Sequence, residues 1–197
     1  GTTYSIQPDR IETATFLCAA AGCGGEVLLR RTDARMLQSV TALLRQTGCE
    51  LLEEQDAVLV RKTGKTGIIS DVKTAAYPGF PTDCQAILTA ALLRAEGENR
   101  IEETVFEDRF HHVPELQKLG AKLEIRHNTV HISGVRTLSG AKLSARDLRG
   151  GAALVLAAMQ AEGESRVEGL THIDRGYERF AEKLRALGAN IERCFDA

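Results

Sequence analysis

The 197-residue sequence has no tryptophan, only five cysteines, and no apolar run long enough to cross a membrane. A bilayer-spanning helix needs about 20 consecutive apolar residues. No charged segment followed by an apolar one begins the chain, so we expect neither a membrane span nor a secretory leader. The cysteines are odd in number and form no Cys-x-x-Cys pair, which favours buried thiols in a reducing compartment over a disulfide framework. These absences predict a soluble, cytoplasmic protein.

An excess of charge of one sign is lacking as well. Lys and Arg number 25, Asp and Glu number 27, and the formal net charge is -2. This balance argues against a general nucleic-acid surface, although it is compatible with a local basic pocket. The glycines at 22–25 are not followed by a lysine at P-loop spacing, so they do not indicate a phosphate loop. With 43% hydrophobic residues, the chain can still form a core for one large domain or two small ones.

A short phrase recurs three times along the chain. It describes an amphipathic helix that ends at a glycine and is followed at once by a strand. The copies are Leu44-Arg-Gln-Thr-Gly48, Leu116-Gln-Lys-Leu-Gly120 and Leu184-Arg-Ala-Leu-Gly188. A glycine suits the left-handed conformation in which many helices end. The repetition predicts three similar units, at about residues 3–62, 71–135 and 140–194.

Each unit is predicted to run strand, helix, strand, helix, strand, strand. The first helices, at 10–21, 82–95 and 148–160, are apolar on most sides, which is typical of helices buried within a core. Second helices are predicted at 34–47, 113–119 and 177–187. Strands are predicted at 3–6, 26–30, 50–54, 57–61, 121–126, 130–133, 142–145, 166–170 and 191–194. The fold class that follows is an α/β inside-out barrel, with buried helices and sheets outside.

The third unit stops at the predicted strand 191–194, without the partner strand that closes the other two units. A sheet edge is therefore predicted to lack a neighbour. Such an edge would accept a strand from elsewhere or allow the chain to associate with itself.

Acidic and basic side chains gather where the predicted helices begin. They are Asp9 and Arg10, Asp33 and Arg35, Asp83, Asp108 and Arg109, Asp147 and Arg149, and Asp174 and Arg175. Taken one by one, such aspartates are ordinary helix caps, and such arginines form surface ion pairs of little energetic weight. If the buried helices share one end, however, their positive N-termini and these side chains predict a pocket for an anionic ligand.

At these residues the sequence resembles the UDP-N-acetylglucosamine 1-carboxyvinyltransferases, the enolpyruvyl transferases that begin peptidoglycan synthesis. The matching phrases are Pro8-Asp-Arg-Ile-Glu-Thr13, Phe80-Pro-Thr-Asp83, Glu103-Thr-Val-Phe-Glu-Asp-Arg109-Phe, Asp147-Leu-Arg149 and His172-Ile-Asp-Arg-Gly-Tyr-Glu178. The resemblance implies two inside-out barrels with the active site in the cleft between them. Residues 1–197 would be the C-terminal barrel, and the N-terminal domain would be its missing partner.

The resemblance implies transfer of the enolpyruvyl group from phosphoenolpyruvate to the 3-hydroxyl of UDP-N-acetylglucosamine. Asp83 would accept the hydroxyl proton and hold the sugar, and Val105 would contact the nucleotide sugar through its backbone. Planar guanidiniums bind carboxylate and phosphate in a bidentate manner. The arginines expected to do so are Arg109, Arg149 and Arg175, with Asp147 orienting them or assisting proton transfer.

Several parts of that family's active site have no counterpart in this sequence. Its Lys-Asn pair and the loop that bears its reactive cysteine are missing, so the isolated chain is expected to be inactive and none of its cysteines takes that role. No cofactor is implied. Adjacent His111 and His112 lack the spacing of metal ligands, so no metal is expected. Many relatives have histidine where Tyr77 stands, and no role is assigned to that position.

Other functions are compatible with the same residues. An enolpyruvylshikimate phosphate synthase shares the implied architecture, although the phrases at 103–110 and 172–178 argue against it. The chain could also be a module that binds anions or nucleotide sugars without turnover. In the third alternative the repeats are purely structural, and the arginines bind no ligand.

Overall fold

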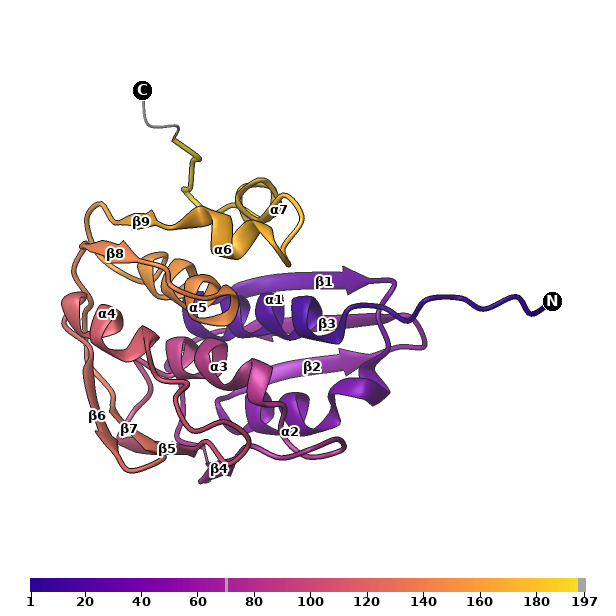
Figure 1. The fold of residues 1–197 in the computed structure, drawn as a ribbon, viewed down its shortest axis with the longest axis horizontal. Helices are drawn as coiled ribbons and strands as arrows, with labels where there is room; N and C mark the ends of the chain where they lie inside the picture. Colours follow the sequence, from indigo (N-terminus) through magenta and orange to yellow (C-terminus); the bar gives the residue numbers. More distant parts are fainter. Residues whose placement is uncertain (70, 195–197) are drawn as a thin grey trace.

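The computed structural model describes residues 1–69 and 71–194. Three helices far apart in the sequence pack against one another at its centre: α1 (Arg10–Cys23), α3 (Gln85–Ala91) and α5 (Leu148–Ala158). Figure 1 shows them side by side, with strands on the outside. Every residue of α3 is buried, as is α1 from Thr13 to Ala21. Their sequences lack a polar face because each is covered by protein on nearly all sides.

Three separate sheets lie around these helices. The first has the order β1-β3-β2 and is antiparallel, from β1 (Gly25–Arg30), β2 (Cys49–Glu53) and β3 (Ala57–Lys62). The second has the order β4-β5-β7-β6, from β4 (Val72–Lys73), β5 (Glu98–Glu102), β6 (Lys122–Arg126) and β7 (Thr129–Ser133). The third is the parallel pair β8 (Lys142–Ser144) and β9 (Arg166–Glu168). Alternate residues such as Ile101, Val130 and Ile132 point into the core, which fits one-sided burial of each sheet.

Shorter helices connect the strands. They are η1 (Ala34–Leu37), which leads into α2 (Gln38–Gln46), η2 (Thr82–Cys84), which leads into α3, and α4 (His112–Lys118), α6 (Leu170–Asp174) and α7 (Phe180–Ala186). Gly48, Gly120 and Gly188 follow α2, α4 and α7 with φ angles of 86°, 87° and 98°. The predicted left-handed helix ends are confirmed.

Two predicted strands are wrong, those at residues 3–6 and 191–194. Figure 1 shows the N-terminal segment leaving the body of the molecule, where no described strand lies beside it. Strands need neighbours for their backbone hydrogen bonds. Residues 71–135 run strand, helix, strand, helix, strand, strand. The order predicted for each unit is therefore incomplete at the start of the first unit and at the end of the third.

The element boundaries near residue 170 also differ from the prediction. β9 ends at Glu168 rather than residue 170, because Gly169 takes a left-handed φ of 80° and begins α6, a helix the sequence did not predict. α7 begins at Phe180 rather than residue 177, after Arg179 with a φ of 51°. The helix predicted over 82–95 begins as the 3-10 turn η2, and its α-helical part ends at Ala91.

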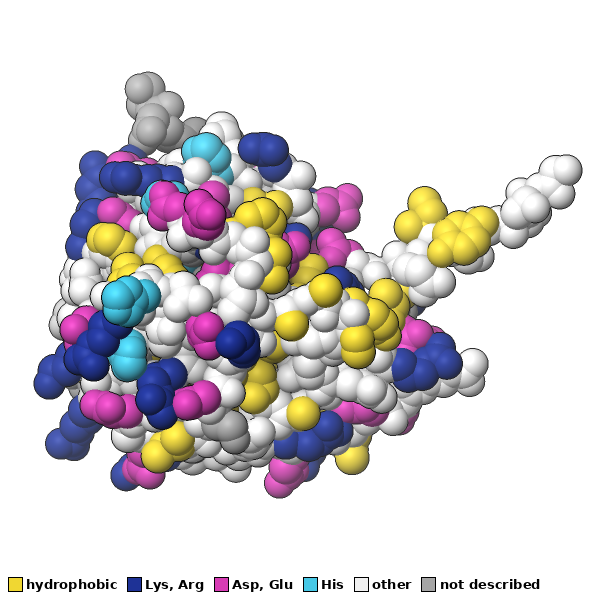
Figure 2. Space-filling view, turned by 60° about the horizontal axis from the view of Figure 1, so that its bottom comes forward, with side chains coloured by type: hydrophobic (Ala, Val, Ile, Leu, Met, Phe, Trp, Pro, Cys, Tyr) yellow, Lys and Arg dark blue, Asp and Glu magenta, His cyan; other side chains and the backbone are white. Residues whose placement is uncertain are grey.

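The surface carries charges of both signs. Figure 2 shows Lys, Arg, Asp, Glu and His side chains interspersed on the side of α4 and of β5–β7, with apolar side chains towards the centre and the opposite side. This mixture agrees with the net charge of -2. None of the helices in the described part of the chain has both the length and the apolar character that crossing a bilayer requires.

Candidate active site

Asp83 lies in η2, at the start of the central helix α3, and its carboxylate faces two arginines. Its Oδ1 lies 2.6 Å from Nη2 of Arg109, and its Oδ2 lies 3.6 Å from Nη2 of Arg149. No side-chain cap closes the start of η2 or of α3. Asp83 therefore does not act as the helix cap that its position suggests, and its charge is directed at guanidiniums from two other segments.

Arg109 is held on three sides. Besides Asp83, it donates from Nη1 to Oγ1 of Thr82 over 2.7 Å, and its guanidinium lies over the ring of Phe106, 4.7 Å from the centroid. The segment between β5 and α4 carries both Phe106 and Arg109, which brings the arginine back to the start of α3. Its side chain is only 25% exposed, so these contacts are shielded from water.

Arg149 lies in the first turn of α5 and packs on Tyr177, 5.6 Å from the ring centroid. The Tyr177 hydroxyl lies 2.8 Å from Oγ1 of Thr15 in α1, so α1, α5 and the segment before α7 meet here. Burial acts to lower the pKa of the Arg149 guanidinium. Tyr177, Asp83 and Asp9 act in the opposite direction and prevail, so its pKa lies above the ordinary value. A fixed positive charge therefore stands beside Asp83 at every physiological pH.

The other two predicted site residues are not joined to this cluster. Asp147 caps α5, because its Oδ1 accepts a 2.7 Å hydrogen bond from the Gly150 amide. Arg175 follows α6 and is exposed, and its side chain forms no hydrogen bond or ion pair with the described residues. Its neighbour Asp174 pairs with Arg193 instead. The predicted roles of Asp147 and Arg175 stay predictions.

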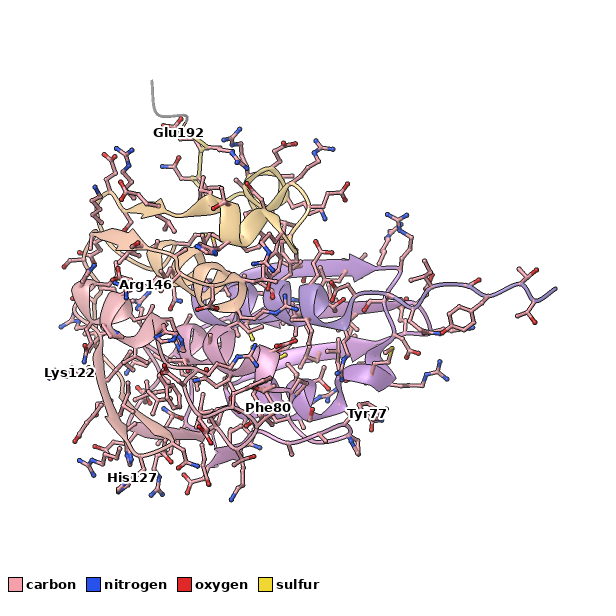
Figure 3. All side chains as sticks on the ribbon, in the orientation of Figure 1. Tyr77, Phe80, Lys122, His127, Arg146 and Glu192 are labelled. Carbon is pink, nitrogen blue, oxygen red and sulfur yellow. The ribbon has the colours of Figure 1, made fainter. Side chains whose placement is uncertain are left out.

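A cleft of about 190 Å³ opens beside the cluster. It is lined by Arg10, by residues 75–77 and 81–83, and by Val105. Figure 3 labels Tyr77 on this side of the molecule, on the opposite side from Lys122. The guanidinium of Arg10 lies over the Tyr77 ring, 5.6 Å from the centroid. The cleft therefore brings Asp83 together with Val105, the two residues predicted to hold the sugar.

A larger hollow of about 380 Å³ lies on the outer face of β5, β6 and β7. Its charges neutralise one another locally, as in the 2.7 Å pair of Arg126 with Glu124. Both partners are largely exposed, and such a surface pair contributes little binding energy. The smaller cleft is the better candidate site, because it is lined by Asp83, whose carboxylate faces partly buried guanidiniums from two other segments.

Burial decides the state of the titratable groups near the site. It raises the pKa of the Cys84 thiol to about 12, and the Asp83 carboxylate adds to the effect. Cys84 therefore stays a neutral thiol and a poor nucleophile at neutral pH. Burial also lowers the pKa of His112 to about 4. Within the described residues, no group of three or more His, Cys, Asp or Glu side chains could hold a metal ion.

Three residues of the cluster had no role in the sequence analysis: Glu103, Phe106 and Tyr177. Glu103 is buried and accepts hydrogen bonds from Thr74 and Thr82, while Phe106 and Tyr177 lie against the two arginines. Each falls within a phrase that carried the family resemblance. Nothing in the local pattern marks them, because their partners come from distant segments.

These observations define an α/β protein with a helical core, sheets outside, and a candidate anion site in which two guanidiniums flank one carboxylate. Among those three charges one positive charge is uncompensated, which favours a further anion. The family model for EPSP synthase (3-phosphoshikimate 1-carboxyvinyltransferase) matches residues 1–184. The chain belongs to this family.

Curated relatives narrow the comparison. The UDP-N-acetylglucosamine 1-carboxyvinyltransferase of Salmonella typhimurium strain LT2 is 52% identical over 193 residues, which cover 98% of this chain and 46% of the relative. The enzyme of the same name from Salmonella typhi gives the same values. The chain thus spans about half the length of the curated relatives it matches.

Solved structures agree on the fold. The enolpyruvyl transferase NikO from Streptomyces tendae has a TM-score of 0.79 and 29% identity, with 95% of this chain and 44% of that one covered. EPSP synthase from Acinetobacter baumannii has a TM-score of 0.75 at 17% identity, with 99% and 49% covered. The second likeness, at such low identity, supports the fold alone.

Proposed function

We propose that this chain supplies one half of the active site of an enzyme that transfers the enolpyruvyl group from phosphoenolpyruvate to the 3-hydroxyl of UDP-N-acetylglucosamine. This is the first committed step of peptidoglycan synthesis, and we expect it in the cytoplasm. The observation that carries the proposal is the Asp83 carboxylate, held between Arg109 and Arg149 beside a cleft. The 52% identity to transferases of that name favours this substrate over shikimate 3-phosphate.

In the proposed reaction, the 3-hydroxyl oxygen of the sugar bonds to C2 of phosphoenolpyruvate while Asp83 accepts the hydroxyl proton. In the same addition, C3 of phosphoenolpyruvate gains a proton. Loss of phosphate from C2 and of a proton from C3 then restores the double bond. Two guanidiniums hold the Asp83 carboxylate in place for proton transfer. Arg109, Arg149 and Arg175 bind the carboxylate and phosphate groups. Asp147 assists by orienting these groups or by moving a proton.

Val105 contributes a backbone acceptor in this proposal. Its amide already donates to Oε1 of Glu103 over 2.9 Å, so its carbonyl oxygen is the backbone group left for a ligand. A carbonyl needs a donor opposite it, such as an amide N–H or a hydroxyl. An N-acetylated sugar carries both of these groups, which supports the choice of substrate.

We further propose that residues 1–197 form one domain with the inside-out barrel arrangement, built from units at about 3–62, 71–135 and 140–194. The helical core with sheets around it supports this. The second domain of the enzyme would supply the remaining catalytic groups, so the isolated chain would be inactive. The two-stranded sheet of β8 and β9 leaves edges at which another strand, or a second copy of the chain, could add.

The test joins this chain to the N-terminal half of the Salmonella typhimurium relative and measures phosphate release together with the mass of the sugar product. We expect product from the joined protein and none from the chain alone. Asp83→Asn should reduce turnover by about 10²- to 10⁴-fold, as expected for loss of a general base.

Two controls separate the alternatives. Inhibition by shikimate 3-phosphate would favour the shikimate reaction. Calorimetric binding of UDP-N-acetylglucosamine without any product from a folded joined protein would favour a binding module. Absence of both binding and product would contradict the proposed function.

A further inference from the structure

Glu103 is a buried carboxylate, 2% exposed, one residue beyond the end of β5. No cation among the described residues pairs with it, and four donors satisfy it instead. Its Oε1 accepts from the Thr74 hydroxyl at 2.8 Å and from the Val105 and Phe106 amides at 2.9 and 3.2 Å. Its Oε2 accepts from the Thr82 hydroxyl at 2.7 Å. A buried anion with this set of donors fixes the direction of every hydrogen bond around it.

The bond to Thr82 sets the polarity of the cluster. A threonine hydroxyl has one proton, and here it points at Glu103. The Thr82 oxygen can therefore only accept from its other neighbour, and Nη1 of Arg109 donates to it over 2.7 Å. The second arm of the same guanidinium reaches Asp83. Glu103 thus prepares, through Thr82, the acceptor that holds one arm of Arg109 while the other arm holds Asp83.

Glu103 also acts on Arg109 from the opposite side. By accepting from the amides of Val105 and Phe106, it bends the segment that follows β5 back on itself. This bend brings the Phe106 ring to the guanidinium of Arg109, 4.7 Å from the centroid. Phe106 is otherwise half exposed, so the core does not hold its ring in place. Arg109 lies between the Thr82 hydroxyl and the Phe106 ring, and the Glu103 carboxylate orients both.

We infer that Glu103 is a positioning residue for Arg109, and that it holds the guanidinium against Asp83 without touching substrate. The claim that Glu103 positions Arg109 rests on the hydrogen bonds and the ring contact described above. The effect of this positioning on turnover rests on the proposed function. A displacement of about 1 Å at a reacting group can cost about 100-fold in rate, so a distant carboxylate of this kind can matter as much as a direct contact.

Glu103→Gln tests the inference with almost no change of shape. Three donors meet at Oε1, so the amide oxygen should stay there and its NH₂ should face Thr82. The Thr82 oxygen then accepts a hydrogen bond from the side-chain amide of the variant, and the hydroxyl proton of Thr82 turns towards Arg109. The Thr82 O–H and the Arg109 N–H would then point at each other, and neither would have an acceptor. The measurement is the order of the Arg109 side chain in the full 197-residue chain, from ¹⁵Nε relaxation and from a crystal structure of the variant.

We expect Arg109 to become mobile and to leave Thr82 in Glu103→Gln. Thr82→Val, which removes the relaying hydroxyl but keeps Glu103, should do the same, and Thr82→Ser should restore order. Glu115→Gln is the matched control, because Glu115 is also buried and binds the Ser144 amide but does not touch the cluster. If Arg109 stays ordered and bonded to Thr82 in Glu103→Gln, the inference is overturned, whatever the protein catalyses.

Turnover of the joined protein adds a double-mutant cycle with Arg109→Ala. Glu103→Gln alone should lower kcat/KM for phosphoenolpyruvate about 100-fold, and should have little further effect once Arg109 is absent. Full additivity would mean that Glu103 only supports the fold, and would overturn the inference. If the joined protein makes no product at all, the proposed function fails, and the order of Arg109 still decides the positioning role.

Discussion

Asp33 and Asp83 both lie where a 3-10 turn leads into a helix, Asp33 as the residue before its turn and Asp83 as the second residue of its turn, and their carboxylates have different partners. Asp33 caps its own turn and pairs with Arg35 two residues away, whose side chain is 82% exposed. Asp83 caps nothing and pairs with two arginines from other elements, of which Arg149 is only 16% exposed. One aspartate therefore binds within its own turn, and the other joins a charge cluster with arginines from two distant segments.

The difference shows that the partners of a charge, rather than its place on a helix, indicate a site. A pair of neighbours in the sequence brings no distant elements together and is screened by water. A carboxylate fixed by arginines from two other segments is preorganised for an anion or a proton. The four predictions that follow test this contrast, and the largest expected effect comes first.

Arg149→Ala should have the largest effect. It removes a largely buried guanidinium that faces Asp83, and the loss of one such donor costs about 10²- to 10³-fold in turnover, about 2.7–4 kcal/mol. Arg35→Ala, which removes the partner of Asp33, should leave turnover unchanged. Steady-state kinetics of the joined protein measure both. Equal losses in the two variants would contradict the contrast between the two regions.

Acid should weaken the fold through a histidine beside the cluster. Burial chiefly lowers the pKa of His112 to about 4, from an ordinary value of 6.5. Within this shift Asp147 opposes the effect of burial, and His111 and Arg109 add to it. The unfolded chain takes up this proton below about pH 6.5, but the folded chain does so only near pH 4. The free energy of unfolding should therefore fall by about 3 kcal/mol between these pH values.

Urea unfolding as a function of pH measures this effect. His112→Leu should flatten the dependence in that range, and His111→Gln, on the exposed neighbour, should leave it in place. An unchanged pH dependence in His112→Leu would show that other groups are responsible.

Tyr177→Phe should have a moderate effect on stability. It removes the hydroxyl that bonds to Thr15 but keeps the ring beneath Arg149. Loss of one buried hydrogen bond costs about 1 kcal/mol in the free energy of unfolding. Because Thr15 also donates to the Ile11 carbonyl, its own hydroxyl keeps a partner. Thermal unfolding measures the change, and a loss of anion affinity as large as that of Arg149→Ala would instead mean that the hydroxyl positions the arginine.

Asp33→Ala should have the smallest effect. The hydrogen bond from Arg35 holds the pKa of the Asp33 carboxyl below its usual range, but the pair joins no distant segments. Because this partner lies only two residues away and is 82% exposed, we expect a slight loss of stability from the missing cap, and unchanged kinetics. A marked loss of turnover in this variant would remove the distinction between the two aspartates.

Much of the fold follows from local sequence. Apolar runs without a polar face predicted the three buried helices, and the glycines at 48, 120 and 188 marked where helices end. The wrong predictions, strands at 3–6 and 191–194, concern segments whose structure depends on a neighbouring strand. A strand has no internal hydrogen bonds, so its sequence alone cannot decide whether it pairs.

Some features of the candidate site also follow from local sequence, and others depend on tertiary packing. The sequence by itself determined that Asp83, Arg109 and Arg149 stand near the starts of helices, because those positions follow from local patterns and from the family phrases. Only the tertiary structure decided that these three meet, that Arg175 stands apart, and that Glu103 holds Thr82. The cap that Asp147 forms on its own helix is local, as the sequence allowed. The physical reason is that a cap is satisfied within one turn, whereas a charge cluster depends on how whole helices pack around the core.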